Sequence, residues 1–451
     1  MNAKLIGVTT VLLLTTFFTN LNAEIVLESL SVLDLETAQK KAMEENPTLT
    51  ASADRVAQAT ERVRQAQSLY YPGLDLTGGA TWTRVSDAST KTQGQRVSIE
   101  KNQERYRLGL EASWLIFDGF SRRFNKLIAE NSEQESMQAR YDGQRLLLQL
   151  VAETYYNAHL ALYTRQIAEA DIAFNLRQLG DAELRYQQGA GSLSSVLNFK
   201  VQINRAKTDL LIAERDYEVI RFSLATLMGV SEAQLPDSLA LAKLEMIEAS
   251  DFLAFEPELL ISKAMVTRPD LLQQHYRMKS RDAAIEQARS KYYPTLRLRG
   301  SVDGDRSDDP GFESEDFGTT IGLSLNYNLY SGGADRARIA ESEAQQREAL
   351  NNFHNQQNNV KKEVREAYSN LLLAQEQLKL QRSTTELVTK TRDLVRDGYN
   401  AGQESLVRLN EAQRDLVRTQ SNLALSLVGL YNSRHRLLTV TGESLQKFQK
   451  K

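Results

Sequence analysis

The sequence predicts a mainly α-helical protein with a transmembrane β portion, arranged as two tandem repeats that each contain two β-strands and long coiled-coil helices. Three observations lead to this fold class. Short motifs return at a nearly fixed offset, long proline-free stretches have coiled-coil spacing, and segments between them alternate apolar and polar residues. Together they describe a duplicated unit.

The repeat is visible in four pairs of motifs. The pairs are Asn46-Pro47 and Arg268-Pro269, Tyr71-Pro72 and Tyr293-Pro294, Phe117-Asp118-Gly119 and Tyr330-Ser331-Gly332, and Tyr186-Gln187-Gln188-Gly189 and Tyr399-Asn400-Ala401-Gly402. Members of the first two pairs are 222 residues apart, and those of the last two are 213 apart. The offset between the repeats decreases between the second and third motifs, so we expect an insertion-tolerant surface loop there.

Residues 1–23 have the pattern of a cleaved signal peptide. Lys4 precedes the apolar run 8–18, and Leu21-Asn22-Ala23 resembles a cleavage site. The apolar run is too short to span a bilayer. We therefore expect an exported chain that begins at Glu24. Because the sequence contains no cysteine, we expect neither disulfides nor N-terminal lipidation.

Four segments alternate apolar and polar residues as β-strands do. They cover about residues 73–85, 105–117, 295–303 and 318–330. Their length suits a tilted transmembrane strand, and aromatic residues lie near their ends, as at a membrane surface: Trp82, Trp114, Phe117 and Tyr330. A half-buried sheet of a soluble protein would explain the alternation but not the aromatic ends. Outside the signal peptide no window has the ~18 apolar residues of a membrane helix, so we expect any membrane span to consist of strands.

Long helices are predicted where proline is absent and apolar residues follow +3/+4 steps. They cover about 120–187, 193–229, 333–400 and 404–441. In each repeat a long helix, a glycine-containing tip and a shorter antiparallel helix follow one another. Asp142-Gly143 and the tract 351–359 interrupt the two long helices, either as a solvated face or as a change of supercoil. The predicted domains are repeat 1 (24–230), an equatorial linker (231–258) of mixed helix and loop, repeat 2 (259–442) and a tail (443–451).

Composition excludes several classes of function. The formal net charge of −3 is too small and too evenly spread to indicate a nucleic acid partner. The acidic stretch 303–309 lacks calcium-ligand spacing, so we expect a solvated extracellular loop there and a second one at 86–104. The histidines are dispersed without metal-ligand spacing: His159, His275, His354 and His435. We expect no metal, no cofactor and no enzymatic activity, since no nucleophile motif, phosphate loop or carboxylate pair is present.

The predicted strands require an oligomer. Four strands cannot close a membrane barrel, for which about eight are needed, and open sheet edges are not tolerated in lipid. The apolar seams of the helices also need neighbours on both sides. A symmetric ring of identical chains with a hollow axis satisfies both requirements.

The signal peptide, the Tyr-Pro strand entries, the two strand exits and the helical tips at 186–192 and 399–405 resemble the TolC family of outer membrane factors over about residues 33–442. The resemblance implies a homotrimer with a shared 12-stranded β-barrel in the outer membrane of a Gram-negative cell, continued by an α-helical barrel in the periplasm. It further implies a channel-tunnel with porin activity. Such a duct is the exit of a tripartite export system, with a periplasmic adaptor (membrane fusion) protein and an inner membrane transporter. Multidrug efflux and type I protein secretion both use such a duct.

The same resemblance places adaptor contacts at the tips, at Gln188, Gly189, Ala190, Ala401, Gly402 and Gln403. The tip glycines also fit a purely structural role in ending a helix. The implied gate residues lie in the second tip, at Tyr399 and Glu404, and just beyond the two tips, at Ser195, Arg408 and Glu411. Arg408 departs from the family's acidic ring. It suggests either an ion-pair latch with Glu404 and Glu411 of neighbouring protomers or ordinary solvated helix charges.

Two other classes of function compete with this interpretation. A soluble periplasmic coiled-coil adaptor or scaffold would explain the helices but would leave the four strands unexplained. A periplasmic hydrolase would need an active site that the sequence does not contain. Recovery of the chain from soluble fractions would favour the adaptor.

Overall fold

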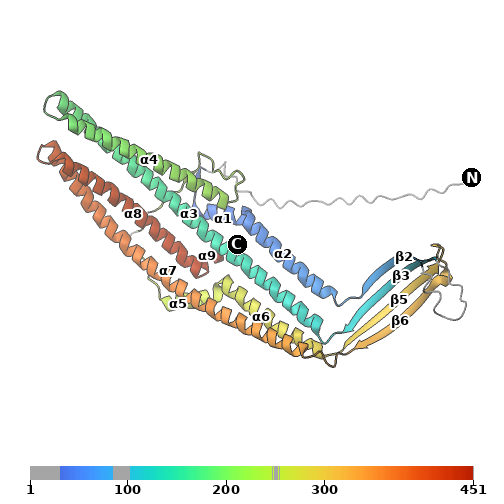
Figure 1. Cartoon of the computed structure of the whole chain (residues 1–451). Coiled ribbons are helices and arrows are strands. Elements are labelled where there is room, and N and C mark those ends of the chain that lie inside the picture. Colours follow the sequence, from blue (N-terminus) through green and yellow to red (C-terminus); the bar gives the residue numbers. More distant parts are fainter. Residues whose placement is uncertain (1–30, 85–101, 246, 248–251, 253, 450–451) are drawn as a thin grey trace, which may run out of the picture.

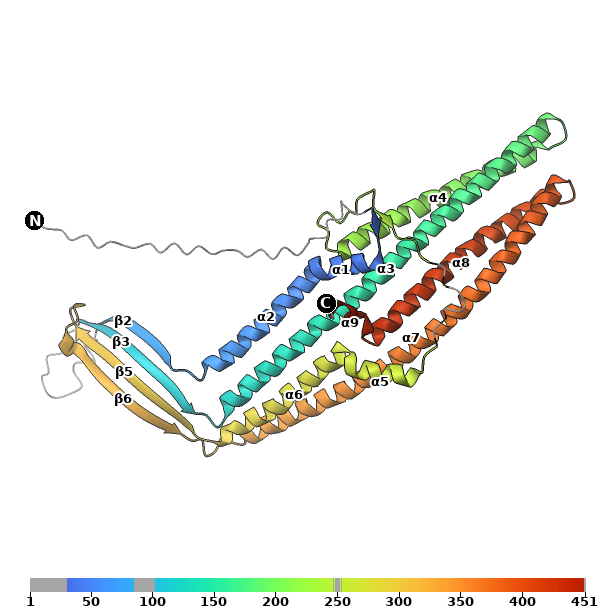
Figure 2. The same ribbon diagram turned by 180° about the vertical axis from the view of Figure 1, so that it is seen from behind.

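The molecule is elongated, with a four-stranded sheet at one end and two helical hairpins that extend away from it (Figures 1 and 2). A computed structural model of the chain describes residues 31–84, 102–245, 247, 252 and 254–449. The predicted signal peptide 1–23 and nearly all of the predicted loop 86–104 lie outside the described residues. Within the described ranges, no helix is both long enough and apolar enough to cross a membrane.

The two helical hairpins have helices of equal length. Helices α3 (Ser121–Gln187) and α7 (Ala334–Asn400) each have 67 residues, and α4 (Leu193–Leu227) and α8 (Leu406–Val440) each have 35. At 1.5 Å per residue, α3 is about 100 Å long. In each repeat the long helix packs against its shorter partner, and α3 also packs against α8. The layer therefore has α3 and α8 inside and α4 and α7 at its two outer edges (Figures 1 and 2).

Helices α2 (Pro47–Ser68) and α6 (Pro269–Arg289) extend this layer to the sheet, and sequence reasoning missed both. Each begins with proline, whose missing N–H costs nothing at the first helical position. The Asn46 side chain caps α2 by accepting from the Thr48 backbone N–H at 2.9 Å. Both helices pack on α3, and α6 also packs on α7. They occupy the part of the layer that the shorter α4 and α8 do not reach (Figure 1).

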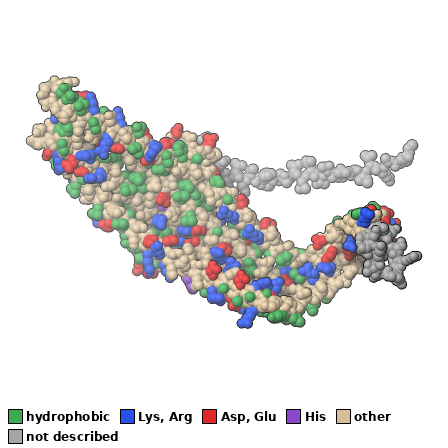
Figure 3. All heavy atoms as spheres, in the orientation of Figure 1, with side chains coloured by type: hydrophobic (Ala, Val, Ile, Leu, Met, Phe, Trp, Pro, Cys, Tyr) green, Lys and Arg blue, Asp and Glu red, His purple; other side chains and the backbone are tan. Residues whose placement is uncertain are grey.

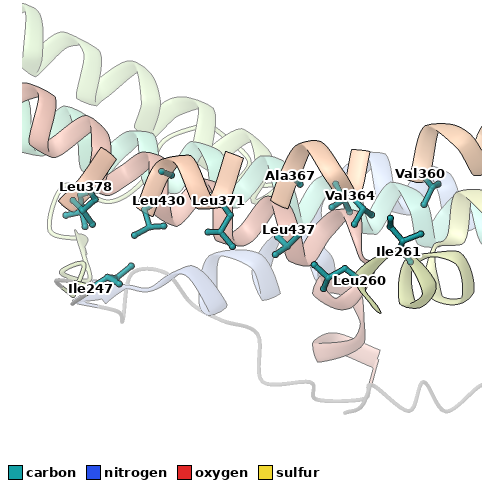
Figure 4. Close-up of a cluster of buried hydrophobic side chains, with 14 of the residues drawn as sticks. Ile247, Leu260, Ile261, Val360, Val364, Ala367, Leu371, Leu378, Leu430 and Leu437 are labelled. Carbon is teal, nitrogen blue, oxygen red and sulfur yellow. The ribbon is translucent and has the colours of Figure 1, made fainter. Parts of the chain in front are cut away.

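Short elements surround the hairpins at the equator. Strand β1 (Val32–Leu33) pairs in parallel with β4 (Ala240–Leu241) from the predicted linker. Helix α1 (Leu35–Glu45) packs on α3, α5 (Pro257–Thr267) packs on α7, and α9 (Glu443–Gln449), from the predicted tail, packs on α8. Figure 4 shows Leu260 and Ile261 of α5 beside the seam that α7 and α8 form with Val364, Leu371 and Leu430. Residues of α5, α7 and α8 therefore form one buried apolar cluster at the equator.

The sheet has the order β2-β3-β5-β6, with every neighbouring pair antiparallel. Its strands are β2 (Gly73–Arg84), β3 (Asn102–Phe117), β5 (Thr295–Ser307) and β6 (Phe317–Asn326). The central pair joins one strand of each repeat. The register places Leu76 opposite Leu110, and Leu110 opposite Val302, so one face is apolar. The short 3-10 turn η5 (Ser314–Asp316) leads into β6.

Three strand boundaries differ from the prediction. Strand β3 begins at Asn102, so residues 102–104 of the predicted loop 86–104 lie in a strand. Strand β5 continues to Ser307, so the acidic stretch expected to be a loop begins inside a strand. Asp305 lies opposite Arg107 and pairs with its guanidinium at 3.7 Å, which places this acid on the polar face of the sheet. Strand β6 ends at Asn326 because its partner Thr295 is the first residue of β5. The segment 327–330 therefore has no strand beside it to pair with.

Buried arginines hold the C-terminus of α8. Arg268, between α5 and α6, is 1% exposed and donates to the Glu363 carboxylate at 2.6 Å and to the Val440 carbonyl at 3.4 Å. Its Nε donates to Asp270 at 2.9 Å. Arg145 of α3 donates to the Thr439 carbonyl at 3.2 Å. The last carbonyls of a helix lack intrahelical partners and carry partial negative charge, so cations stabilise them. This cluster joins both hairpins at the equator.

We expect Asp270 to make the chain sensitive to acid. Burial alone would raise the pKa of this carboxyl, but the hydrogen bond and charge of Arg268, together with the charge of Arg145 and a hydrogen bond from Gln356, outweigh burial and lower the pKa below the usual 3.8. A lowered pKa gives stability that is present above the unfolded value and is lost as pH falls through the folded value. The wild type should therefore lose more thermal stability below pH ~4 than the Asp270→Asn variant does. Melting curves from pH 7 to pH 3 test this, and parallel pH profiles would contradict it.

Candidate functional site: the helical tips and the sheet

The first tip joins α3 to α4 by a glycine turn. Gly189 has φ +73°, in the left-handed region that residues with a side chain rarely adopt. The backbone N–H groups of Gln188 and Ala190 donate to carbonyls of the last turn of α3, at 3.1 and 2.9 Å. Ser192 then caps α4 by accepting from the Ser195 backbone N–H at 3.2 Å. These bonds fix a compact tip whose end is exposed.

The second tip repeats this geometry between α7 and α8. Gly402 has φ +78°, and the Ala401 N–H donates to the carbonyl of Asp397 at 2.9 Å. The Gln403 N–H donates to the carbonyl of Gly398 at 2.8 Å. All six residues predicted as adaptor contacts are exposed at these two tips. The tips are thus matched surfaces at the same end of the molecule (Figure 1).

The two hairpins are joined near their tips by polar and aromatic contacts. Arg185 of α3 donates to the carbonyl oxygen of Asn400 at 3.2 Å, and its guanidinium lies 5.5 Å from the centre of the Tyr399 ring. Tyr399 also packs edge-on against Phe199 of α4, with ring centres 6.5 Å apart. Asn410 donates to the side-chain oxygen of Asn198 at 2.8 Å. The predicted gate residue Tyr399 therefore lies within the contact between the hairpins.

A second polar contact joins the hairpins further from the tips. Gln413 of α8 donates to Asp171 of α3 at 2.7 Å, and Arg392 of α7 donates to Gln413 at 2.9 Å. Burial raises the pKa of Asp171, and the hydrogen bond from Gln413 only partly opposes this. Sequence reasoning missed these residues because no local pattern links positions more than 200 residues apart. The only sequence signal for such a contact is a polar residue at a heptad position that is expected to be buried.

The other predicted gate residues lie on the exposed surface of this protomer. Arg408 pairs with Glu411 one turn along α8 at 2.9 Å, and both side chains are about half exposed. In the described part of the chain no ion pair joins Glu404 to Arg408. The Ser195 hydroxyl lies 3.0 Å from the Ser192 hydroxyl at the start of α4. On the face shown in Figure 3, positive and negative side chains are interspersed along the helices. A single protomer therefore shows the intrahelical pair, and a contact between protomers stays a prediction.

The sheet exposes an entire apolar face. Leu76, Ile321 and Leu325 are each more than two thirds exposed, although they lie in regular strands. Trp114, at the end of the sheet near the helices, donates through Nε1 to the Tyr70 carbonyl at 3.0 Å. Trp82 lies near the opposite end of β2. An exposed apolar sheet face with aromatic residues at both ends is typical of contact with lipid.

The remaining predicted interface aromatics lie where the strands meet the helices. Phe117 is the last residue of β3 and packs edge-on against Phe120, with ring centres 5.4 Å apart. Tyr330 is almost fully exposed in the connection from β6 to α7. Asp118, in the same strand exit, accepts from the Arg122 backbone N–H at 2.9 Å and so caps the first turn of α3.

A duplicated layer of long helical hairpins attached to a sheet with one exposed apolar face is the arrangement found in channel-forming proteins of the outer membrane that extend into the periplasm. The chain belongs to the outer membrane efflux protein family: the family model with this description matches residues 38–230 and 260–443. The predicted family is thereby confirmed, and the chain is a transport protein rather than an enzyme.

Individual relatives match nearly the whole chain. The outer membrane efflux protein BepC of Brucella suis is 27% identical over 418 residues, which cover 90% of this chain and 85% of BepC. The cation efflux system protein CusC of Escherichia coli is 22% identical, covering 86% of this chain and 82% of CusC. The outer membrane protein TolC of Vibrio cholerae is 24% identical, covering 87% and 86%.

Solved structures have the same fold. The CmeC outer membrane channel of Campylobacter jejuni superposes with a TM-score of 0.80 at 14% identity, over 92% of this chain and 88% of CmeC. The outer membrane protein VceC of Vibrio cholerae superposes with a TM-score of 0.74 at 17% identity, over 90% and 96%. The predicted fold class, two repeats of strands and long helices, is confirmed.

Proposed function

We propose that this chain is the exit duct of a tripartite export system, assembled as a homotrimer with a periplasmic adaptor protein and an inner membrane transporter. The observation that carries the proposal is that both layers of the protomer end in unsatisfied edges. Strands β2 and β6 each have one neighbour, so each leaves a row of backbone N–H and C=O groups unpaired. Such edges are not tolerated in lipid, and pairing with copies of the same chain removes them.

The edge helices support the same assembly. On α7, Leu373, Leu380, Leu387 and Leu394 recur at intervals of seven residues, and all are more than half exposed. On α4, at the opposite edge, the corresponding exposed apolar residues are Leu197, Val201, Leu211 and Val219. A heptad stripe of leucine needs a partner helix, so we propose that α7 of one protomer packs on α4 of the next. This contact joins two different edges of the protomer, and such a contact generates a ring when the rotation between neighbouring protomers closes.

A ring of three protomers would contribute 12 strands to a shared barrel, with the apolar face toward outer membrane lipid and the polar face toward the lumen. The helices would extend this duct into the periplasm, and the exposed tips at Gly189 and Gly402 would receive the adaptor. The names of BepC and CusC refer to efflux, which supports small-molecule efflux as the first cargo class to test. Type I protein secretion remains the alternative cargo class.

We propose that residues 1–23, outside the described residues, direct export and are removed. One relative, from Salmonella typhimurium, is named a probable outer membrane lipoprotein, SilC, and is 20% identical over 85% of this chain. Lipidation at an N-terminal cysteine is not available here, because the sequence has no cysteine. We therefore propose a mature chain without a lipid anchor. Intact mass measurement of the protein purified from outer membranes tests both statements.

The proposed gate is tested by ion conductance in a planar bilayer. We expect the purified trimer to form pores of low resting conductance, because the tips of six hairpins close the periplasmic end. Replacing Arg408 or Glu411 by alanine should raise the resting conductance if these residues pair between protomers. Lys362→Ala, an exposed change on α7 far from the tips, is the control. A soluble monomer or dimer without pores would reject the duct and favour the adaptor.

A further inference from the structure

A polar cavity of about 500 Å³ lies where the sheet meets the helices. Its walls come from the bases of β3, β5 and β6, the first turn of α3, and the connection from α6 to β5 that contains the 3-10 turn η4 (Ser290–Tyr292). Small-molecule sites have this size and usually combine apolar walls with a few polar groups. Leu69, Leu115 and Tyr293 supply the apolar part of the wall. The cavity can therefore receive an organic molecule of moderate size.

The acids of this cavity are already neutralised. Asp118 pairs with Arg122 at 3.2 Å. Asp335 accepts from the Ser331 hydroxyl at 2.6 Å and lies 3.4 Å from the Arg338 guanidinium. The charge of Arg122 is balanced by Asp118, and its two terminal nitrogens donate to the carbonyl of Leu115 at 2.6 Å and to that of Ile116 at 3.0 Å. None of these three groups is left to bind or repel a ligand by its charge.

Two cations in the cavity wall have no such partner. Lys291 and Arg297 have neither an ion pair nor a side-chain hydrogen bond to any residue that the structure describes, and both are exposed. Asn326 and Asn328 add amide groups to the same wall. Unpaired cations beside amide donors make a site for an oxyanion, because guanidinium groups match carboxylate and phosphate geometry.

The position of Arg297 in the sheet decides which compartment the cavity faces. Arg297 lies opposite Ser324 on β6, whereas its neighbour Leu298 lies opposite Trp114 and Leu323 on the apolar face. The cavity therefore opens on the polar side of the sheet. For this lumenal location the inference rests on the proposed duct.

We propose that this cavity is a binding site for organic anions, one in each protomer, at the neck of the duct. Its ligands are small molecules with an apolar body and a carboxylate or phosphate group, and Lys291 and Arg297 bind the anionic group. The site gives the duct a preference for anionic cargo at the point where the helical part passes into the sheet.

Calorimetric titration of the full chain in neutral detergent tests the site with benzoate and with benzamide, which has the same shape without the charge. We expect saturable benzoate binding, at least about 10-fold tighter than benzamide and weakened by salt. Lys291→Gln and Arg297→Gln should each weaken benzoate by about 10-fold. Arg299→Gln is the matched control, because Arg299 lies on the same face of β5 but pairs with Glu111 at 2.7 Å.

Equal binding of benzoate and benzamide, or equal loss in Arg299→Gln and Arg297→Gln, would overturn the proposal. A short-chain anionic phospholipid belongs to the proposed ligand class and should compete with benzoate, so a lack of competition would also overturn the proposal. The oligomeric mass is measured on the same samples. A failure to form trimers would reject the duct while leaving the calorimetric result on the anion site intact, so the two failures are distinguishable.

Discussion

Arg268→Met should lower the free energy of unfolding by about 3–5 kcal/mol, the cost of breaking a buried ion pair by removing one partner. Methionine preserves much of the aliphatic volume but leaves Asp270 buried without its cation, and it leaves the Val440 carbonyl without this donor. Arg268→Lys should fall between the wild type and methionine, because an ammonium cannot reproduce the two-pronged contact with Asp270. Thermal and denaturant unfolding of the detergent-solubilised protein measure the effect.

Arg365→Met is the control for this change. Arg365 lies on α7, pairs with Glu258 at 3.1 Å, and is more than half exposed, so its loss should change stability by at most about 0.5 kcal/mol. An Arg268→Met protein as stable as Arg365→Met would show that Arg268 does not stabilise the contact of α6 and α7 with the end of α8.

The elements that the sequence predicts best are those in which apolar residues recur at regular intervals. The long helices were predicted to within a few residues because they bury leucine, valine and phenylalanine at heptad positions. Helices α2 and α6 were missed because what they bury includes much alanine, such as Ala59, Ala66 and Ala283, which gives a weak apolar signal. Their first residues, Pro47 and Pro269, are visible as repeat motifs, but a proline alone does not show that a helix follows.

Contacts between the repeats were beyond sequence reasoning for a different reason. Strand ends depend on the neighbouring strand, so the end of β6 follows from where β5 begins. The contacts of Arg185 with Asn400, and of Asp171 with Gln413, join residues more than 200 positions apart. The unpaired state of Lys291 and Arg297 likewise emerges only when every neighbouring acid has been assigned a partner. The predicted roles of the tip and gate residues remain predictions.

The second large effect is expected at the proposed seam between α7 of one protomer and α4 of the next. Leu380→Glu combined with Leu387→Glu should convert the trimer to monomers, because both side chains are more than 60% exposed in the protomer and would be buried against α4 of the next copy. Burying a leucine side chain contributes about 1.5–3 kcal/mol, so each seam loses about 3–6 kcal/mol even before the cost of burying two carboxylates. This corresponds to roughly two to four orders of magnitude in the association constant of each seam. Native mass spectrometry in detergent measures the change.

Lys379→Glu provides a strict control, because it reverses a charge on the same helix next to one of these leucines. Lys379 is exposed and lies near Glu376 at 3.8 Å, one turn earlier on the solvated face of α7. Lys379→Glu changes the charge of α7 by −2, the same as the two leucine changes together. If the trimer depended on the overall charge of α7, Lys379→Glu would therefore weaken it as much as they do. If it depends on the leucine stripe, Lys379→Glu stays trimeric. Intact trimers in the double leucine variant would show that the seam lies elsewhere. The edge helices would then no longer support a closed ring.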